Sequence, residues 1–178
     1  MIEKGMPFTL WLTGISGSGK TILARELEIK LKEMGRRVQV VDGDEIRAKI
    51  GRELGFEKKD RISSIIRGGK ICKRLNARGI IAIAPYFSPY EEGRIVVRGM
   101  VPRHVEIFVN CPVEICRKRD PKGLYGKASK GELKNFADIV DAYERPKNPE
   151  ITVNTHEMNV EESVNHILAN LRERRLNR

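Results

Sequence analysis

A glycine-rich stretch near the N-terminus constrains this chain most. Residues 14–21 read GISGSGKT and satisfy the pattern GxxxxGK[ST]. An apolar, β-prone run, FTLWLTG, comes before the stretch, and a run with apolar residues at helical spacing follows it and closes at Gly35. Between a strand and a helix, such a loop folds its backbone amides around an anion at the helix N-terminus. The sequence therefore predicts a phosphate-binding loop and not only a tight turn.

The same loop contains the side chains that a nucleoside triphosphate site requires. Lys20 is expected to reach the β and γ phosphates, and the Thr21 hydroxyl is expected to hold Mg²⁺. The backbone around the phosphates would come from Gly14, Ser16, Gly17, Ser18 and Gly19. The expected cofactors are ATP and Mg²⁺. The chain lacks the length of a motor or transporter ATPase and a convincing NKxD segment of a GTPase, so a small phosphotransferase is the better match.

Strand-like and helix-like segments alternate along the rest of the chain. The strand candidates after the loop are RRVQVV, GIIAIAP, HVEIFVN and ITVNT. This alternation predicts an α/β fold in which a mostly parallel five-stranded sheet has helices on both faces. With 178 residues, the chain is expected to form one domain over residues 1–178. The polar, lysine-rich segment near 119–136 is predicted to be a lid. Before the third strand, RISSIIRGGKICKRLNARG has a longer, weaker helix pattern that contains a Gly68-Gly69 interruption.

The charge balance favours anionic ligands. Lys and Arg outnumber Asp and Glu by 34 to 24, which gives a net charge of +10. The basic residues are not interleaved with aromatic ones, so we expect small nucleotides as partners and no nucleic acid. No segment has the roughly 18 to 20 unbroken apolar residues of a membrane span, and the first residues lack the apolar run of a signal peptide. The expected location is the cytoplasm, with no membrane partner.

The cysteines give no sign of a disulfide framework or a zinc site. Cys72, Cys111 and Cys116 are odd in number and have neither CxxC spacing nor nearby histidine pairs. A free cysteine behaves as a small apolar side chain, and it is among the residue types most often buried. We therefore expect three reduced thiols in or near the core.

Acidic and basic residues follow the second predicted strand, where ligands of open α/β sheets gather. Asp42-Gly43-Asp44 comes first, and Arg47 lies three residues beyond Asp44. A carboxylate here could accept a proton from an attacking hydroxyl or order Mg²⁺, and the arginine could bind an anionic acceptor. In the simpler interpretation, Asp44 is the N-cap of a short helix and Arg47 is a solvated charge. These residues alone leave both interpretations open.

Further residues could converge on two phosphorylated ligands. Phe56 precedes Arg61, and Ser88 follows the third predicted strand. Each of the cations could also be an ordinary solvated charge. The remaining basic candidates are Arg94, Arg98, Arg119, Lys122 and Lys127.

Several motifs, taken in order, resemble those of adenylylsulfate kinases. They are GISGSGKT, DGDEIR, LGFEKKDR, FSPYEEGR, RDPKGLYGKASKGELKNF and YERPKNPEI, and they extend from about residue 8 to residue 155. The motifs RDPKGLY, DGD and LGF with DR are far more specific than the phosphate loop. The resemblance implies a P-loop NTPase fold. It also implies an enzyme that uses MgATP to phosphorylate the 3′-hydroxyl of adenosine 5′-phosphosulfate (APS).

On the acceptor side, the resemblance assigns a role to each matching position. Asp44 corresponds to an essential aspartate near the acceptor hydroxyl, and Arg47 and Arg61 to arginines that grip the phosphosulfate. Phe56 and Phe136 correspond to two aromatic residues that sandwich the acceptor adenine. The resemblance thus implies that Asp44 is catalytic and that the other four bind substrate.

On the ATP side and at the third strand, the resemblance adds three more positions. Arg119 would lie beside the ATP adenine and Lys122 near the phosphates, within the lid. Ser88 matches a serine that is phosphorylated in many members, and it is predicted to be catalytic and substrate-binding. Direct in-line transfer needs no covalent intermediate on Ser88, because positioned reactants and charge stabilisation suffice.

The chain departs from the family pattern on the acceptor side. Ser64 replaces an asparagine that contacts the acceptor, Ile66 replaces an arginine, and Phe87 replaces the usual isoleucine. Ser64 and Phe87 are still expected to bind substrate. The departures leave open a kinase of another nucleotide conjugate, or an ATP-binding regulatory protein that has lost transfer. The kinases that this chain resembles are often dimers, so a homodimer is expected.

Overall fold

One parallel sheet forms the centre of the protein. The computed structural model describes residues 6–50, 57–133 and 136–174, without the side chains of 47–50 and 137–139. The sheet has the order β2-β3-β1-β4-β5, and each neighbouring pair is parallel. Its strands are β1 (Thr9–Thr13), β2 (Val38–Val40), β3 (Ile81–Tyr86), β4 (His104–Asn110) and β5 (Ile151–Asn154). The predicted five-stranded α/β fold is confirmed.

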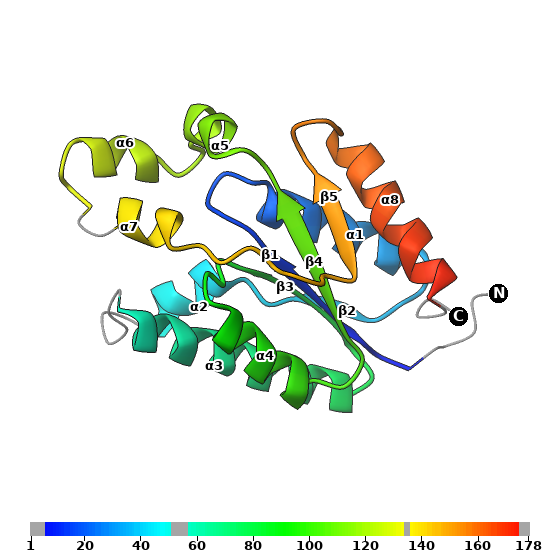
Figure 1. The fold of residues 1–178 in the computed structure, drawn as a ribbon. Helices are drawn as coiled ribbons and strands as arrows, with labels where there is room; N and C mark the ends of the chain where they lie inside the picture. The colour runs from blue at the N-terminus through cyan, green and yellow to red at the C-terminus, as the bar shows by residue number, and fades with distance from the viewer. Residues whose placement is uncertain (1–5, 51–56, 134–135, 175–178) are drawn as a thin grey trace.

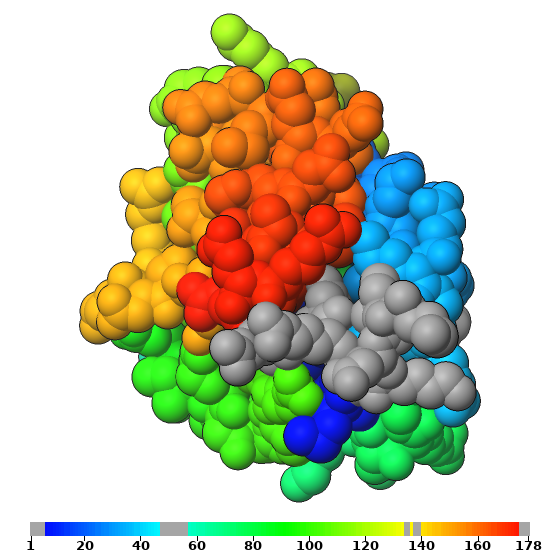
Figure 2. All heavy atoms as spheres, turned by 90° about the vertical axis from the view of Figure 1, so that its right-hand side faces the viewer, coloured from blue at the N-terminus to red at the C-terminus, as the bar shows by residue number. Residues whose placement is uncertain are grey.

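Helices cover both faces of the sheet, as predicted (Figure 1). On one face lie α1 (Lys20–Glu33) and α8 (Val160–Glu173), which pack against each other, as Figure 2 also shows from the side of α8. On the other face lie α3 (Lys58–Ala77) and α4 (Glu91–Met100). Four shorter helices are α2 (Gly43–Ile50), α5 (Val113–Arg119), α6 (Leu124–Ser129) and α7 (Phe136–Asp141). No helix in the described residues is long and apolar enough to cross a bilayer.

The central strands supply the core. Every residue of β1 and β3 is buried, as expected for strands covered on both faces. Trp11 is fully buried, and its ring stacks on Tyr86 with centroids 4.7 Å apart. The predicted burial of the three cysteines is confirmed, and all three are free.

The predicted helix over this segment is confirmed as α3, which continues unbroken through the glycine pair that interrupts its pattern. A Cβ atom on Gly68 would lie 2.4 Å from the ring and hydroxyl of Tyr86. On Gly69, a Cβ would lie 3.0 to 3.3 Å from side chains of α4. Glycine therefore lowers helix propensity here but lets the helix approach the sheet and α4 closely. That close approach depends on tertiary neighbours and cannot be seen in a local helix pattern.

Helix α4 lies where no helix is predicted from the sequence. Its first turn has Glu91 and Glu92 and its last turn has Arg98, charges that suit the two ends of the helix dipole. The segment near 119–136, predicted as a polar lid, begins at the end of α5 and contains α6. Figure 1 shows α5, α6 and α7 gathered at one end of the sheet, which is where the phosphate-binding loop lies.

His104 should make the protein less stable in acid. Burial lowers the pKa of this side chain to about 4, and neither ring nitrogen has a hydrogen-bond partner among the described residues. The unfolded chain therefore binds a proton from about pH 6.5 downward that the folded chain does not. Between pH 7 and pH 5 this should cost about 2 kcal/mol of unfolding free energy.

Urea unfolding at the two pH values measures this loss, and His104→Leu should remove most of it. His166→Leu, a change at a half-buried histidine on α8, is the matched control. An equal pH dependence in the wild type and His104→Leu would contradict the assignment.

Candidate active site

A cavity of about 850 Å³ lies where the strands end and the phosphate-binding loop begins. Its walls come from the loop and α1, from α2 and α3, from the residues after β3, from the lid helices and from the start of α8. It brings together eleven of the sequence-predicted site residues. These are Ser16, Gly17, Gly19, Lys20, Thr21, Asp44, Arg61, Phe87, Arg119, Lys122 and Phe136.

The loop folds tightly against α5. Gly17 has φ = 80°, and a Cβ atom there would lie 2.8 Å from the carbonyl oxygen of Cys116. Both the backbone conformation and the close approach require glycine. Helix α1 begins at Lys20, directly after the loop, so its first amides face the cavity end. The loop thus has the geometry of an anion cradle.

Lys20 is a buried cation at the centre of this cradle. Its Nζ donates to the carbonyl oxygen of Ile15 at 2.8 Å, and only 9% of the residue is exposed. The pKa of Lys20 is lowered to about 8, mainly by burial; the charge of Lys122 contributes to the shift, while Asp44 opposes it. A bound polyphosphate would supply the negative charge that the buried ammonium group lacks.

Of the two aspartates after β2, Asp42 and not Asp44 is the N-cap of the next helix. Asp42 caps α2, because its Oδ1 accepts from the amides of Asp44 at 2.9 Å and Glu45 at 3.4 Å. The prediction of Asp44 as the N-cap is therefore wrong, and Asp44 lies in the first turn with its side chain facing the cavity. Asp42 Oδ2 also accepts from the Thr21 hydroxyl at 3.4 Å. Asp42 is thus a site residue that belongs to the DGD motif but was not among the predicted site residues.

The lid reaches the opposite side of the cavity through two contacts. Lys122 forms an ion pair with Asp44, and the Tyr125 hydroxyl donates to the carbonyl oxygen of Ser16 at 2.7 Å. The lid holds its own shape through Asp120, whose carboxylate accepts from the amides of Tyr125 and Gly126. The lid lysine and the carboxylate after β2 therefore meet, although they are 78 positions apart in the chain.

An aromatic and cationic wall closes the acceptor side. Arg61 on α3, Phe87 after β3 and Phe136 at the start of α7 all line the cavity. The Phe136 ring is buried and meets the edge of Tyr125 with centroids 5.1 Å apart. Phe56 and the Arg47 side chain lie outside the described residues, so their predicted roles stay predictions.

Four predicted site residues do not line the cavity. Gly14 and Ser18 lie in the loop but away from the cavity, with Ser18 fully buried, and Ser64 is buried in α3. Ser88 has no exposed surface; its hydroxyl accepts from Trp11 Nε1 at 3.1 Å and donates to Thr13 Oγ1 at 2.8 Å. Catalytic and substrate-binding roles for Ser88 stay predictions, and the structure gives its side chain a place between two buried strands.

One wall of the cavity comes from residues that sequence reasoning missed. Thr155, Met158 and Val160 line it beside Ile22, whose side chain is 56% exposed at the start of α1. Arg119 donates to the carbonyl oxygen of Thr155 at 2.7 Å, which holds the end of α5 beside this wall. An apolar surface next to a guanidinium group suits a nucleotide base. These residues follow the last strand, and position after a strand was the only sequence signal for them.

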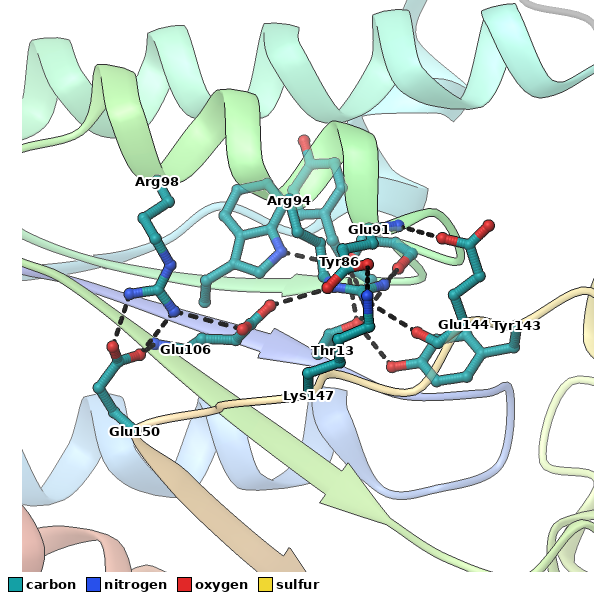
Figure 3. Close-up of polar contacts among 12 residues, drawn as sticks. Thr13, Tyr86, Glu91, Arg94, Arg98, Glu106, Tyr143, Glu144, Lys147 and Glu150 are labelled. Carbon is teal, nitrogen blue, oxygen red and sulfur yellow. Dashed lines mark hydrogen bonds and ion pairs between the residues drawn. The ribbon is translucent and has the colours of Figure 1, made fainter.

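Arg94 is not a phosphate ligand but the centre of a buried polar network (Figure 3). The residue is 3% exposed, and its Nε lies 3.1 Å from Glu106 Oε1. Its two terminal nitrogens donate to the carbonyl oxygens of Ser88 at 2.6 Å and Glu144 at 2.7 Å. The expectation that Arg94 could reach a phosphorylated ligand is therefore wrong. The arginine joins the segment after β3 to the segment before β5.

Arg98 extends the same network away from the cavity. It pairs with Glu150 at 2.5 Å and with Glu106 at 3.3 Å, and the amide of Glu106 donates to Glu150 (Figure 3). Burial raises the pKa of Glu106, while Arg94 and Arg98 oppose the shift. A buried carboxylate between two arginines is thus charge-compensated and anchors α4 on β4.

Comparison with known proteins agrees with this geometry. The family model described as adenylylsulphate kinase matches residues 6–154. The chain belongs to the adenylylsulfate kinase family. The adenylyl-sulfate kinase of Halothermothrix orenii is 44% identical over 172 residues, covering 97% of this chain and 92% of its own length. That of Rippkaea orientalis is 46% identical over 173 residues, covering 97% and 94%.

Solved structures give the same result for this adenylylsulfate kinase. The Mycobacterium tuberculosis APS kinase in complex with AMPPNP and APS has a TM-score of 0.88 and 34% identity, covering 94% of this chain and 99% of its own. A Sinorhizobium meliloti gluconokinase has a TM-score of 0.65 at 18% identity, which shows a shared fold alone. The predicted P-loop kinase fold and the use of ATP with Mg²⁺ are confirmed.

Proton uptake on ATP binding should reveal the buried lysine. Because the pKa of Lys20 in the free protein is about 8, most Lys20 is neutral at pH 9, and the ATP phosphates should recharge it. Calorimetric titration in buffers of different ionisation enthalpy should show uptake of about one proton at pH 9 and little at pH 7. Lys20→Arg, which stays charged, should abolish the difference. Equal uptake at both pH values would contradict the assignment.

Proposed function

We propose that this chain transfers the γ-phosphoryl group of ATP to the 3′-hydroxyl of APS, giving 3′-phosphoadenosine 5′-phosphosulfate. The observation that carries the proposal is the single cavity that holds the phosphate loop, Asp44 and Arg61 together under the lid. Lys20 lies on the ATP side, and Arg61 and Phe136 lie on the acceptor side. The identity to adenylyl-sulfate kinases over nearly the whole chain supports APS as the acceptor.

Each side chain has a separate task in the proposed transfer. Asp44 orients the 3′-hydroxyl and accepts its proton as the oxygen attacks the γ-phosphorus. Lys20 stabilises the negative charge that spreads over the transferred group. Lys122 separates from Asp44 and stabilises the same charge from the lid side. Arg61 holds the phosphosulfate, and Phe136 stacks on the acceptor adenine. The proton moves to Asp44 and the leaving ADP keeps the electron pair of the broken P–O bond.

The residues beside the loop fit a magnesium ion. The Thr21 hydroxyl and the Asp42 carboxylate are neighbours, and Asp44 faces the same cavity. Mg²⁺ prefers oxygen ligands, and it commonly takes one or two from protein and the others from phosphates and water. In the described residues, no group of three His, Cys, Asp or Glu side chains could bind a metal ion alone, which suits such shared coordination. When bound, the ion neutralises phosphate charge.

Ser88 acts through its neighbours in this proposal. Its fully buried hydroxyl links Trp11 on β1 to Thr13 at the entrance of the phosphate loop. We assign it the task of fixing the end of β3 against the loop, with no phosphorylated intermediate.

We also propose that the protein is a cytoplasmic homodimer, as kinases that it resembles often are. Sedimentation should then give about twice the chain mass of 20.3 kDa, and a monomer would contradict this.

The reaction is tested by offering MgATP with several acceptors. Incubation with APS, AMP, 3′-deoxy-APS and gluconate should give ADP with APS alone, together with a new 3′-phosphomonoester in the ³¹P NMR spectrum. The 3′-deoxy analogue lacks the attacking oxygen and should give neither product. ADP release with gluconate but not with APS would contradict the proposed acceptor, and ADP with no new ester would contradict transfer.

Asp44→Asn should separate transfer from ATP binding. Loss of the general base should lower kcat by about 10² to 10⁴, because the amide cannot take the hydroxyl proton. The Kd for ATP should change less than about threefold, since the phosphate loop is unaltered. Glu45→Gln, one residue along the same helix, is the matched control, because Glu45 is exposed and pairs with Arg25. Wild-type turnover in Asp44→Asn would remove Asp44 from the mechanism.

A further inference from the structure

The ring of Phe87 lies near two cations of the site. Its centroid is 6.0 Å from Lys20 Nζ and 5.7 Å from Arg61 Cζ. Both distances are at the outer limit of the range in which a cation is attracted to an aromatic face. Lys20 belongs to the ATP side and Arg61 to the acceptor side, so one neutral side chain contacts both halves of the cavity.

Phe87 is itself held by a half-buried tyrosine. The ring of Tyr143 stacks on that of Phe87 with centroids 6.0 Å apart and on that of Phe108 with centroids 6.3 Å apart. The Tyr143 hydroxyl lies 2.8 Å from Thr13 Oγ1, at the entrance of the phosphate loop. Burial raises the pKa of Tyr143 to about 12, so the hydroxyl stays protonated over the working pH range. Tyr143 therefore connects Phe87 to the loop that holds Lys20.

Arg94 holds the chain at both of these aromatic residues. It donates to the carbonyl oxygen of Ser88, the residue after Phe87, and to that of Glu144, the residue after Tyr143. Its guanidinium also lies 5.8 Å from the Tyr143 ring. Figure 3 shows Arg94, Glu144 and Tyr143 converging around the end of β1. One buried side chain thus fixes the backbone on which each ring is carried.

We propose that Phe87 is a positioning residue, whose ring, clamped by Tyr143, sets Lys20 and Arg61 relative to each other so that both phosphorylated substrates meet in register. A carboxylate between the cations would hold them too, but it would neutralise charge that the phosphates need. A ring attracts both without adding a competing anion. This inference deepens the proposed function and rests on it for its acceptor half.

Replacement of the ring by an aliphatic side chain tests the proposal. Phe87→Leu should lower kcat with MgATP and APS about tenfold, since two weak cation contacts are lost, and change either KM less than about threefold. Phe87→Tyr keeps the ring and should stay within threefold of the wild type. Phe87→Met is a second aliphatic variant with a more adaptable shape, and thermal unfolding checks that each variant is folded.

A readout that needs ATP alone separates this proposal from the identity of the acceptor. In Phe87→Leu, the pH midpoint of proton uptake on ATP binding should move down by about half a pH unit, because charged Lys20 loses its ring. Absence of transfer to APS by the wild type would sink the proposed function and leave this midpoint as the test of Phe87. Tyr143→Leu should act in the same direction, and the double variant should fall no further than Phe87→Leu.

Phe108→Leu is the matched control. Phe108 also stacks on Tyr143 and lies 5.4 Å from the cation of Arg145, but it does not line the cavity. Its loss should alter thermal stability without changing kcat or the midpoint. The proposal is overturned by wild-type kcat and midpoint in Phe87→Leu and Phe87→Met, by the same losses in Phe108→Leu, or by effects of Phe87→Leu and Tyr143→Leu that simply add.

Discussion

The buried ammonium group of Lys20 is the constraint on which the site depends. Its Nζ donates to the carbonyl oxygen of Ile15 in its own loop at 2.8 Å, and burial is the main cause that lowers its pKa to about 8. A buried cation without a counter-charge costs free energy, and a bound polyphosphate supplies that counter-charge. The same ammonium group therefore contributes to ATP binding and to stabilisation of the charge on the transferred phosphoryl group. The tight glycine turn of the loop, the carbonyl oxygen of Ile15 and the ring of Phe87 surround that charge.

A second buried charge, Arg94, holds the surroundings of the first. Its bonds to Ser88, Glu144 and Glu106 join three segments that are distant in sequence, and its removal would leave Glu106 buried between fewer partners. The segment after β3 presents Phe87 to the cavity, and the segment before β5 presents Tyr143 to Phe87. In the proposed arrangement, Arg94 therefore helps to place Lys20 and Arg61 although it does not line the cavity itself.

Local signals predicted much of this protein, and non-local contacts account for the rest. The phosphate loop and the five strands were predicted from local patterns, whereas Asp44, Arg61, Lys122 and Phe136 were assigned through motifs that resemble those of adenylylsulfate kinases, and all four line the cavity. Arg94 was misplaced because a buried arginine is recognised only by partners up to 50 positions away. The reason for Gly68 in α3 could not be predicted, because its neighbour, Tyr86, comes from another element. The wall at Thr155, Met158 and Val160 has no motif, since apolar contact with a base is satisfied by many side chains.

The position of APS in a complex with an unreactive ATP analogue tests the central claim most directly, because the claim is that one cavity aligns both nucleotides for transfer. A crystal structure of that complex should place the γ-phosphate against Lys20, the APS adenine against Phe136 and the ribose 3′-oxygen within hydrogen-bonding distance of the Asp44 carboxylate. An APS molecule bound outside this cavity, or one whose 3′-oxygen points away from Asp44 and the γ-phosphate, would contradict the account.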